Sequence, residues 1–271
     1  MITRIEKLAQ IERAIQLYVE EKMPIMKASA IANIGSATLQ IHLKKRGLTR
    51  SNKQNSRKYT LNEYYFQDIN TTDKAYWLGF MYADGFLSLS KHYNQKNVGI
   101  SLHEKHASHL NSFKTTISAT YPIKHYQSVS YGVLVDYVKL LVTSDKMFDD
   151  LKKQGCFEHK SLNLIFPNEQ QVPKFLMSNF IRGYFDGDGS FSKSHDGYQL
   201  KICGTQEFLR KLLEQIGFSN QKIYKRYKDG KNHYYCSIGG KKQVSQIGGY
   251  FYENATIFLE RKHKRYLKLI S

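Results

Sequence analysis

Two stretches, AYWLGFMYADG at residues 75–85 and NFIRGYFDGDG at residues 179–189, repeat one pattern and decide the fold. Each copy predicts a helix that ends on an Asp-Gly pair. A glycine in a helix interior costs about 1 kcal/mol relative to alanine, so small residues repeated on one face indicate a close approach. We therefore expect the two helices to pack backbone to backbone. The small pairs that share a face at helical spacing are Gly79/Ala83 and Gly183/Gly187.

The Asp-Gly pairs predict two carboxylates at neighbouring helix ends. Gly85 and Gly189 stand where a helix C-terminus favours a left-handed residue, which places Asp84 and Asp188 at the negative ends of two helix dipoles. Two carboxylates there repel each other unless a divalent cation neutralises them, and oxygen ligands suit a hard ion such as Mg²⁺. In the alternative interpretation, the helices form a plain core and the Asp-Gly pairs are turns. The predicted metal-site residues are Asp84, Asp188, Ala83 and Gly187.

This duplicated segment resembles the signature of the LAGLIDADG homing endonucleases in their single-chain, two-motif form, over about residues 58–271. The resemblance implies an α/β (α+β) fold of two pseudo-symmetric αββαββα repeats, residues 63–166 and 167–271, whose antiparallel sheets form a saddle over DNA. One position departs from the family pattern. The first acidic position of the motif holds Tyr82 in one copy and Asp186 in the other, whereas the later, metal-binding position holds Asp in both.

By this resemblance, the chain is a site-specific double-strand DNA endonuclease that hydrolyses phosphodiesters at a long asymmetric site. Its cofactor would be Mg²⁺, for which Mn²⁺ can substitute, and Asp84 and Asp188 would each serve one strand. Lys160 and Lys262 fall at similar places near the ends of the two repeats, and the resemblance places such a cation near the attacked phosphate. The alternative for both lysines is an ordinary phosphate contact or a surface charge.

Two other functions of the same fold stay open. One is a DNA-binding transcription regulator that no longer cuts, and the other is an RNA maturase that assists splicing of its host intron. The expected partner is accordingly double-stranded DNA or intron RNA. The expected assembly is a monomer with internal pseudo-two-fold symmetry.

Composition agrees with a nucleic-acid partner. The chain has 271 residues, and its 41 Lys and Arg against 23 Asp and Glu give a net charge of +18, which favours a polyanion unless the charge is merely a solvated surface. No run of about 18 apolar residues predicts a membrane span, and the N-terminus lacks the apolar region of a signal peptide. Three scattered cysteines without CxxC spacing indicate a reduced setting and no zinc site. The expected location is the cytoplasm, or the organelle or phage-infected cell that holds the target DNA.

Residues 1–48 resemble a helix-turn-helix and predict a small, separate all-α module. Ile11, Ile15, Tyr18 and Val19 form an apolar stripe, and Pro24 can open a second helix. Asn33 suits a left-handed turn, and Gly35 can cap a third helix with Leu39 and Leu43 inward. A plain helical hairpin is the alternative. The third helix would present to DNA Ser36, Gln40 and Lys44.

A basic run at residues 44–58, with seven basic residues and no acidic one, overlaps the predicted linker 49–62. It either tracks DNA phosphates or is simply solvated. The linker-side residues predicted to contact DNA are Lys45, Arg46, Arg50, Lys53 and Arg57.

Strand-like segments follow both motif copies. Alternation predicts an apolar face with Phe86 and Phe191 and an opposite, polar face that could lie in a DNA groove. Polar outer faces are common in any α/β protein, so this interface rests on the resemblance. The predicted contacts are Ser88, Ser90, Ser190, Ser192, Lys193 and Lys201.

Overall fold

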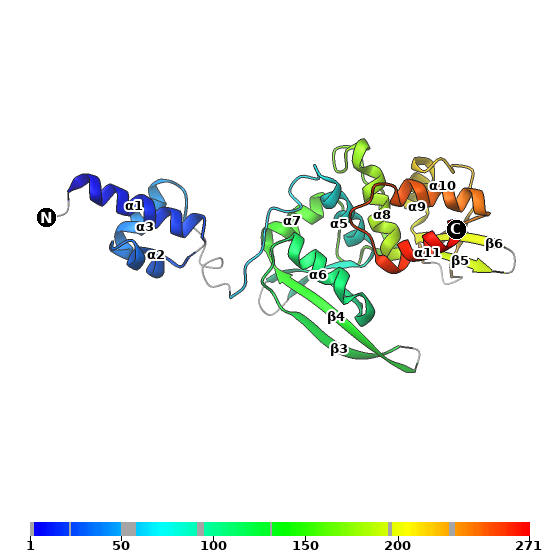
Figure 1. Ribbon diagram of the computed structural model, residues 1–271, viewed down its shortest axis with the longest axis horizontal. Helices are drawn as coiled ribbons and strands as arrows, with labels where there is room; N and C mark the ends of the chain where they lie inside the picture. The colour runs from blue at the N-terminus through cyan, green and yellow to red at the C-terminus, as the bar shows by residue number, and fades with distance from the viewer. Residues whose placement is uncertain are drawn as a thin grey trace. The chain divides into compact units, whose positions relative to one another are not determined.

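The computed structural model describes residues 3–21, 23–49, 58–90, 95–130, 132–194, 197–227 and 231–271. The chain forms two compact units, Met1–Tyr59 and Thr60–Ser271, both drawn in Figure 1. Among the helices that are described, none is long and apolar enough to cross a membrane.

The first unit contains helices α1 (Arg4–Val19), α2 (Ile25–Ile31) and α3 (Ser36–Lys45). Thr3 begins α1 with a capping box that also uses Glu6. Asn33 has a positive φ of 55°, and Gly35 is the N-cap of α3, as the sequence predicts. Val19 is 43% exposed and does not belong to the apolar stripe. The buried core consists of Ile11, Ala14, Ile15, Leu17, Tyr18, Ala28, Ala32, Leu39 and Leu43.

The second unit repeats one order of elements twice, which confirms the predicted helix-strand-strand-helix-strand-strand-helix repeat. The first copy comprises α5 (Thr72–Ala83), β1 (Gly85–Ser90), β2 (Gln95–His103), α6 (Ala107–Thr116), β3 (Ile123–Ser130), β4 (Val133–Thr143) and α7 (Asp145–Lys153). The second comprises α8 (Met177–Asp188), β5 (Gly189–Ser194), β6 (Gly197–Gly204), α9 (Gln206–Gln215), β7 (Ile223–Lys225), β8 (Tyr234–Gly239) and α10 (Lys241–Tyr252), and α11 (Glu260–Ile270) follows.

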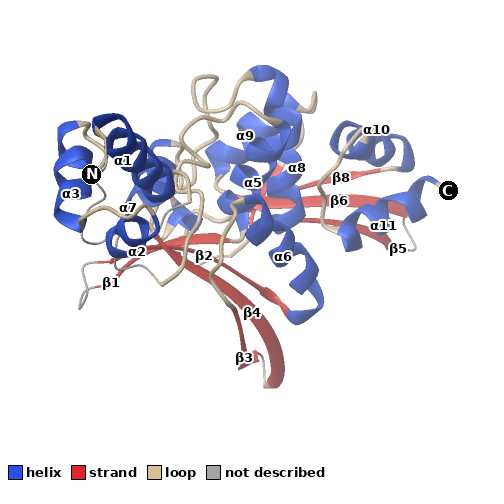
Figure 2. Ribbon diagram, turned by 60° about the vertical axis from the view of Figure 1, so that its left-hand side comes forward, coloured by secondary structure: helices blue, strands red, loops and turns tan. Residues whose placement is uncertain are grey.

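Each repeat contributes one antiparallel sheet, with strand order β1-β2-β4-β3 in the first and β5-β6-β8-β7 in the second. Figure 2 shows the two sheets extending from the central helices α5 and α8. One face of each sheet is packed and the other is open, because apolar residues alternate with polar ones along the strands. The packed faces carry Val98, Ile100, Val138 and Leu140 in the first sheet, and Leu200, Ile202, Cys236 and Ile238 in the second.

Helices α5 and α8 lie in direct backbone contact, as their small residues predict. A Cβ atom added to Gly79 would lie 1.9 Å from the Phe180 carbonyl oxygen, and one added to Gly183 would lie 1.9 Å from that of Tyr76. Neither position has room for a side chain. The repeated pattern thus encodes the axis that joins the two halves.

Gly85 and Gly189 do not adopt the predicted left-handed conformation. Both have negative φ and begin strands, and Gly189 is extended at φ −101° and ψ 170°. They are needed for space instead. An added Cβ would lie 2.5 Å from Met81 Cε at Gly85 and 2.1 Å from Phe185 Cδ2 at Gly189.

Candidate active site

The paired helices bring two carboxylates to one place. Asp84 caps the C-terminus of α5, and Asp188 is the last residue of α8. A Cβ added to Gly187 would lie 3.3 Å from Asp84 Oδ2, so the carboxylate of one helix reaches the last turn of the other. Asp84 is half-buried, while Asp188 is open to solvent on one side.

Burial and the nearby Asp188 carboxylate raise the pKa of Asp84 to about 6. Desolvation at the helix end also raises the pKa of Asp188, and Lys160 and Lys262 oppose that rise. Both carboxylates therefore ionise less readily than a free aspartate, and the two lysines offset part of that effect.

Two buried lysines lie at the same helix ends. Lys160 is 8% exposed and donates to the carbonyl oxygens of Ala83 and Gly85. Lys262 is 2% exposed and donates to the carbonyl oxygens of Phe185 and Asp186 at 2.6 Å and of Gly187 at 3.0 Å. A cation at a helix C-terminus is favourable, because it offsets the negative end of the dipole.

Burial lowers the pKa of both ammonium groups, that of Lys262 to about 8, so Lys262 remains largely protonated at neutral pH. The carbonyl oxygens of Ala83 and Gly187, which belong to the predicted metal site, already accept hydrogen bonds from these lysines. Each oxygen keeps a second lone pair.

Asp186 has a position in the motif but no role that its sequence alone reveals. Its side chain is 1% exposed and accepts hydrogen bonds from the hydroxyls of Tyr76 and Tyr252, both at 2.8 Å, and from the Leu259 N–H at 2.6 Å. Burial raises its pKa. Periodicity could not find these partners, because they come from other helices far along the chain.

The open face of the first sheet carries Ser88 and Ser90, as predicted, but it also carries Phe86. Residues 86, 88 and 90 share one face, whereas the buried Leu87 points to the core. The prediction of Phe86 on the apolar face was therefore wrong. Gly99 lies opposite Phe86 and leaves room for its ring, over which Lys139 Nζ lies 4.8 Å from the centroid.

The open face of the second sheet carries Ser190, Ser192 and Lys201, and Ser190 pairs with Lys201. Lys201 Nζ lies 4.2 Å from the ring centroid of Tyr235. Lys193 alternates with Ser192 and therefore lies on the opposite face, on the same side as the buried Phe191. The structure separates Lys193 from the other predicted contacts.

Arg226 and His233 were missed by sequence reasoning. Both lie close enough to Asp188 to lower its pKa, after the larger effects of the two lysines. Arg226 follows the last residue of β7, and its N–H donates to the His233 carbonyl oxygen at 2.9 Å, a pairing that periodicity alone does not reveal.

In the first unit, Gln40, Lys44 and Lys45 of α3 are exposed and Ser36 is half-buried. Arg46 is engaged elsewhere, since its guanidinium donates to the Glu12 carboxylate of α1, with Nη1 2.8 Å from Oε2. The predicted contacts Arg50, Lys53 and Arg57 lie outside the described residues.

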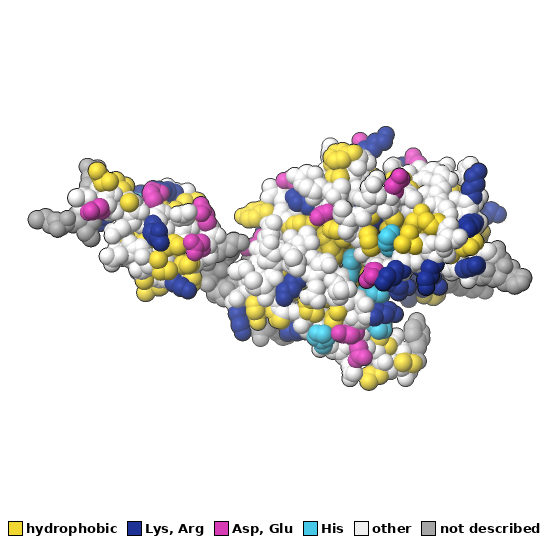
Figure 3. Space-filling view, viewed as in Figure 1, with side chains coloured by type: hydrophobic (Ala, Val, Ile, Leu, Met, Phe, Trp, Pro, Cys, Tyr) yellow, Lys and Arg dark blue, Asp and Glu magenta, His cyan; other side chains and the backbone are white. Residues whose placement is uncertain are grey.

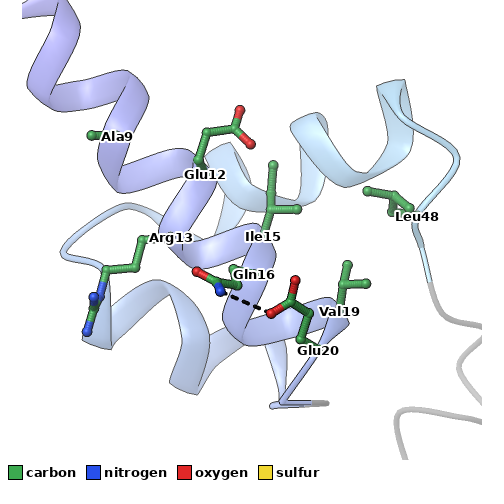
Figure 4. A pocket seen from close by; sticks show the side chains of 8 residues that line it. All are labelled: Ala9, Glu12, Arg13, Ile15, Gln16, Val19, Glu20 and Leu48. Carbon is green, nitrogen blue, oxygen red and sulfur yellow. Dashed lines mark hydrogen bonds between the residues drawn. The ribbon is translucent and has the colours of Figure 1, made fainter.

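A groove of about 590 Å³ runs along α1 (Figure 4). Glu12 and Glu20 line it, and Glu20 accepts a hydrogen bond from Gln16 at 3.0 Å. Arg13 also lines this groove, and Glu12 is paired with Arg46, so basic side chains largely balance the acidic ones there.

A LAGLIDADG-like domain is the family whose model matches the chain, at residues 176–261. The homing endonuclease I-WcaI, solved bound to its DNA recognition sequence, is 13% identical and similar over 72% of this chain and 87% of its own, with a TM-score of 0.53. A double mutant of I-SmaMI is 13% identical over 72% of this chain and 88% of its own, with a TM-score of 0.50. No curated protein sequence matches the chain.

At an identity of 13%, the similarity to the solved structures concerns the fold alone. The family model covers the second repeat from the start of α8 to the first turn of α11. The second repeat therefore matches the model of a LAGLIDADG-like domain, and the chain has a fold similar to that of the single-chain LAGLIDADG homing endonucleases.

Proposed function

We propose that the chain is a site-specific double-strand DNA endonuclease that hydrolyses one phosphodiester in each strand of a long, asymmetric site. One observation carries the proposal. The carboxylates of Asp84 and Asp188 meet at adjacent helix ends, where a buried lysine lies at each end. We expect an asymmetric target because the open faces of the two sheets differ. Phe86 pairs with Gly99 in the first sheet, and Ser190 pairs with Lys201 at the equivalent position of the second.

A divalent cation, Mg²⁺ or Mn²⁺, fits this site by its chemistry. Burial and mutual repulsion disfavour ionisation of the aspartates, and a hard cation offsets both effects. Within the described residues, no cluster of three or more His, Cys, Asp and Glu could hold a metal ion, so substrate oxygens would complete the ligands. When bound, the ion supplies polarisation of the phosphate and activation of water.

The chain's own groups orient and neutralise the substrate. Asp84 and Asp188 would hold the ion, with the carbonyl oxygens of Ala83 and Gly187 nearby. The ammonium groups of Lys160 and Lys262 would stabilise negative charge that develops on the attacked phosphates. The open sheet faces would position the duplex, and α3 of the helix-turn-helix-like unit would add a contact in the major groove.

The test is cleavage of a randomised duplex library with Mg²⁺, with cut ends identified by sequencing. EDTA and an Asp84→Asn/Asp188→Asn double variant serve as controls. Metal-dependent cuts at one long site, absent in the double variant, are the expected result. Specific retention of DNA without cuts would instead favour a non-cleaving regulator.

Asp188→Asn alone should abolish double-strand cleavage and leave DNA binding within about threefold of the wild type, because the amide keeps the shape but loses the charge that holds the cation. Binding is measured by fluorescence anisotropy in Ca²⁺, alongside cleavage in Mg²⁺. Loss of binding as the main effect would contradict a metal role for this residue.

A second candidate function, binding of intron RNA, is favoured by a separate basic surface. Figure 3 shows Lys and Arg side chains gathered over α11, whose exposed residues include Arg261, Lys264 and Arg265. α11 packs on the covered side of its sheet, with the Tyr266 ring 5.9 Å from Phe191. A groove of about 620 Å³ adjoins it, lined in part by Lys105 and His106. Retention of RNA that competing duplex DNA does not displace would support this function.

A further inference from the structure

The first acidic position of the repeated pattern holds Tyr82 in one copy and Asp186 in the other, and both side chains are buried. We propose that Tyr82 and Asp186 are positioning residues that hold the segments carrying Lys160 and Lys262 against the ends of α5 and α8, and that the second copy holds its lysine more firmly. This inference deepens the proposed endonuclease function and rests on it, because that function assigns the two lysines to the two attacked phosphates.

In the second copy, Asp186 connects four helices. Its carboxylate accepts from Tyr76 of α5, from Tyr252 at the end of α10 and from the backbone N–H of Leu259, which is the N-cap of α11. Lys262 lies in the first turn of α11, and its N–H donates to the Leu259 carbonyl oxygen at 2.8 Å. The carboxylate therefore fixes the start of the helix that presents the lysine.

Arg182 reinforces this connection one helical turn earlier on α8. It is 3% exposed, and its guanidinium donates to the carbonyl oxygens of Ile257 and Phe251, both at 3.0 Å. Arg182 and Asp186 are four residues apart, so they share one face of α8 and together hold the backbone on both sides of the α10–α11 connection. Charge-assisted hydrogen bonds of this kind are about twice as strong as neutral ones.

In the first copy, the neutral hydroxyl of Tyr82 stands where the second copy has the Asp186 carboxylate. Tyr82 Oη donates to the carbonyl oxygen of Gln154, the C-cap of α7, at 2.5 Å. Gly155 follows at φ +91°, and an added Cβ there would lie 2.0 Å from Tyr82 Oη, so the chain turns tightly over the hydroxyl. Lys160 then begins a short 3₁₀ helix, Lys160–Leu162. Leu78, at the position equivalent to Arg182, is apolar.

Lysine labelling tests the positions of the two side chains without DNA or metal. The full chain is acylated with acetic anhydride, and labelling rates are read by peptide mass spectrometry. Tyr82→Phe, which keeps the ring, should raise the rate at Lys160 roughly fivefold and leave Lys262 unchanged, the effect expected for one lost hydrogen bond. Asp186→Ala should raise the rate at Lys262 by more than fivefold, because three hydrogen bonds are lost, and leave Lys160 unchanged. Asp186→Asn, which keeps an oxygen for the Leu259 N–H, should restore much of the protection.

Strand-resolved nicking of a duplex with a different fluorophore on each strand gives the second measurement. Tyr82→Phe should slow one strand roughly fivefold, and Asp186→Ala, which removes three hydrogen bonds, should slow the other strand by more, at unchanged DNA affinity. Unchanged labelling, or equal increases at both lysines in either variant, would overturn the inference, and Tyr82→Phe provides this test even if Asp186→Ala fails to fold. The predicted labelling in a protein that cuts neither strand would support the positioning roles while removing the proposed endonuclease function.

Discussion

At the scale of single residues, the contact between the two halves depends on Gly79 and Gly183, which have no side chain. Gly79→Ala or Gly183→Ala would place a methyl group 1.9 Å from a carbonyl oxygen of the other helix, and backbone atoms cannot rotate away as a side chain can. The helices would have to separate along their length. We expect either variant to lower the free energy of unfolding of the second unit by about 3 kcal/mol or more, measured by urea unfolding.

Gly239→Ala in β8 is the matched control for these variants. Its added Cβ would meet its nearest neighbour, the Tyr198 carbonyl oxygen, at an ordinary 3.8 Å. This variant should change stability by less than about 1 kcal/mol. Equal effects at Gly79 and Gly239 would show that the helix contact is not as tight as described.

His109 gives the second unit a pH dependence of its own. The side chain is 7% exposed, and its Nε2 lies 3.0 Å from the hydroxyl of Tyr76, which itself donates to Asp186. Because that hydroxyl donates to Asp186, it accepts from His109, so Nε2 carries a hydrogen. Burial, helped by His106 and Lys262, lowers the pKa of His109 from its usual 6.5 to about 3.

The imidazole of His109 takes up a proton near pH 6.5 in the unfolded chain but only near pH 3 in the folded chain. The contribution of His109 to the free energy of unfolding is therefore fully present above pH 6.5 and is lost as the pH falls below it. The loss between pH 7 and pH 5 should be about 2 kcal/mol. His109→Gln, which can still donate to Tyr76, should remove that part of the dependence in denaturant titrations.

Single residues also show where sequence reasoning reaches its limit. The crowding at Gly79 and Gly183 was predictable, because helical spacing alone puts both small pairs on one face. Gly85 and Gly189 were correctly singled out but for the wrong reason. Their φ angles depend on the strands that follow, and the atoms that exclude a Cβ, in Met81 and Phe185, belong to neighbouring residues whose rotamers a sequence does not give.

At the scale of elements, the open face of each sheet pairs a lysine with an aromatic ring, but on different strands of the two sheets. Lys139 of β4 lies over Phe86 of β1 in the first sheet, whereas Lys201 of β6 lies over Tyr235 of β8 in the second. Each pairing presents a cation on an aromatic surface, which suits contact with a phosphate and a sugar or base. The different positions would favour different half-sites.

Salt dependence should identify the lysines that contact phosphate. Lys139→Gln and Lys201→Gln should each weaken duplex binding and lower the slope of log K against log salt by about 1. The measurement is fluorescence anisotropy over a range of NaCl concentrations. Lys193→Gln is the matched control, since it removes the same charge from the other face of β5, and a slope change there as large as at Lys201 would contradict the proposed interface.

Strand alternation was only partly predictable. In β5, one buried aromatic between two serines fixes the faces without ambiguity. In β1, Phe86 and Leu87 are adjacent and both apolar, so the sequence cannot show which one faces the core. The structure decides for Leu87, because Gly99 on the next strand makes a shallow space for the Phe86 ring on the open side.

At the scale of the whole molecule, the duplication in the sequence predicted the two repeats and their contact, because the same short pattern occurs twice. The unequal anchoring of the two lysines was not predictable, since Asp186 acquires its partners only when α5, α10 and α11 converge on it.

The division into two compact units leads to a prediction about the isolated second unit. Its structure begins at Thr60, whose carbonyl oxygen accepts from the Thr120 N–H at 2.9 Å, and the Asn62 N–H donates to the Ile117 carbonyl oxygen at 2.8 Å. Both partners belong to the second unit itself, as does the proposed active site. We therefore expect residues 60–271 to fold alone and to cut at the same position as the full chain.

The full chain should then show two thermal transitions in calorimetry, because the first unit buries only a small core and is expected to unfold at a lower temperature. Residues 60–271 should lack that transition and keep the other within about 2 °C.

The DNA affinity of residues 60–271 should be at least tenfold lower than that of the full chain, since the exposed Gln40, Lys44 and Lys45 of α3 are lost. The single-turnover cleavage rate at saturating protein should stay within about twofold. A shifted cut position, or a collapse of the cleavage rate at saturation, would mean that the first unit helps to build the active site rather than only to bind DNA.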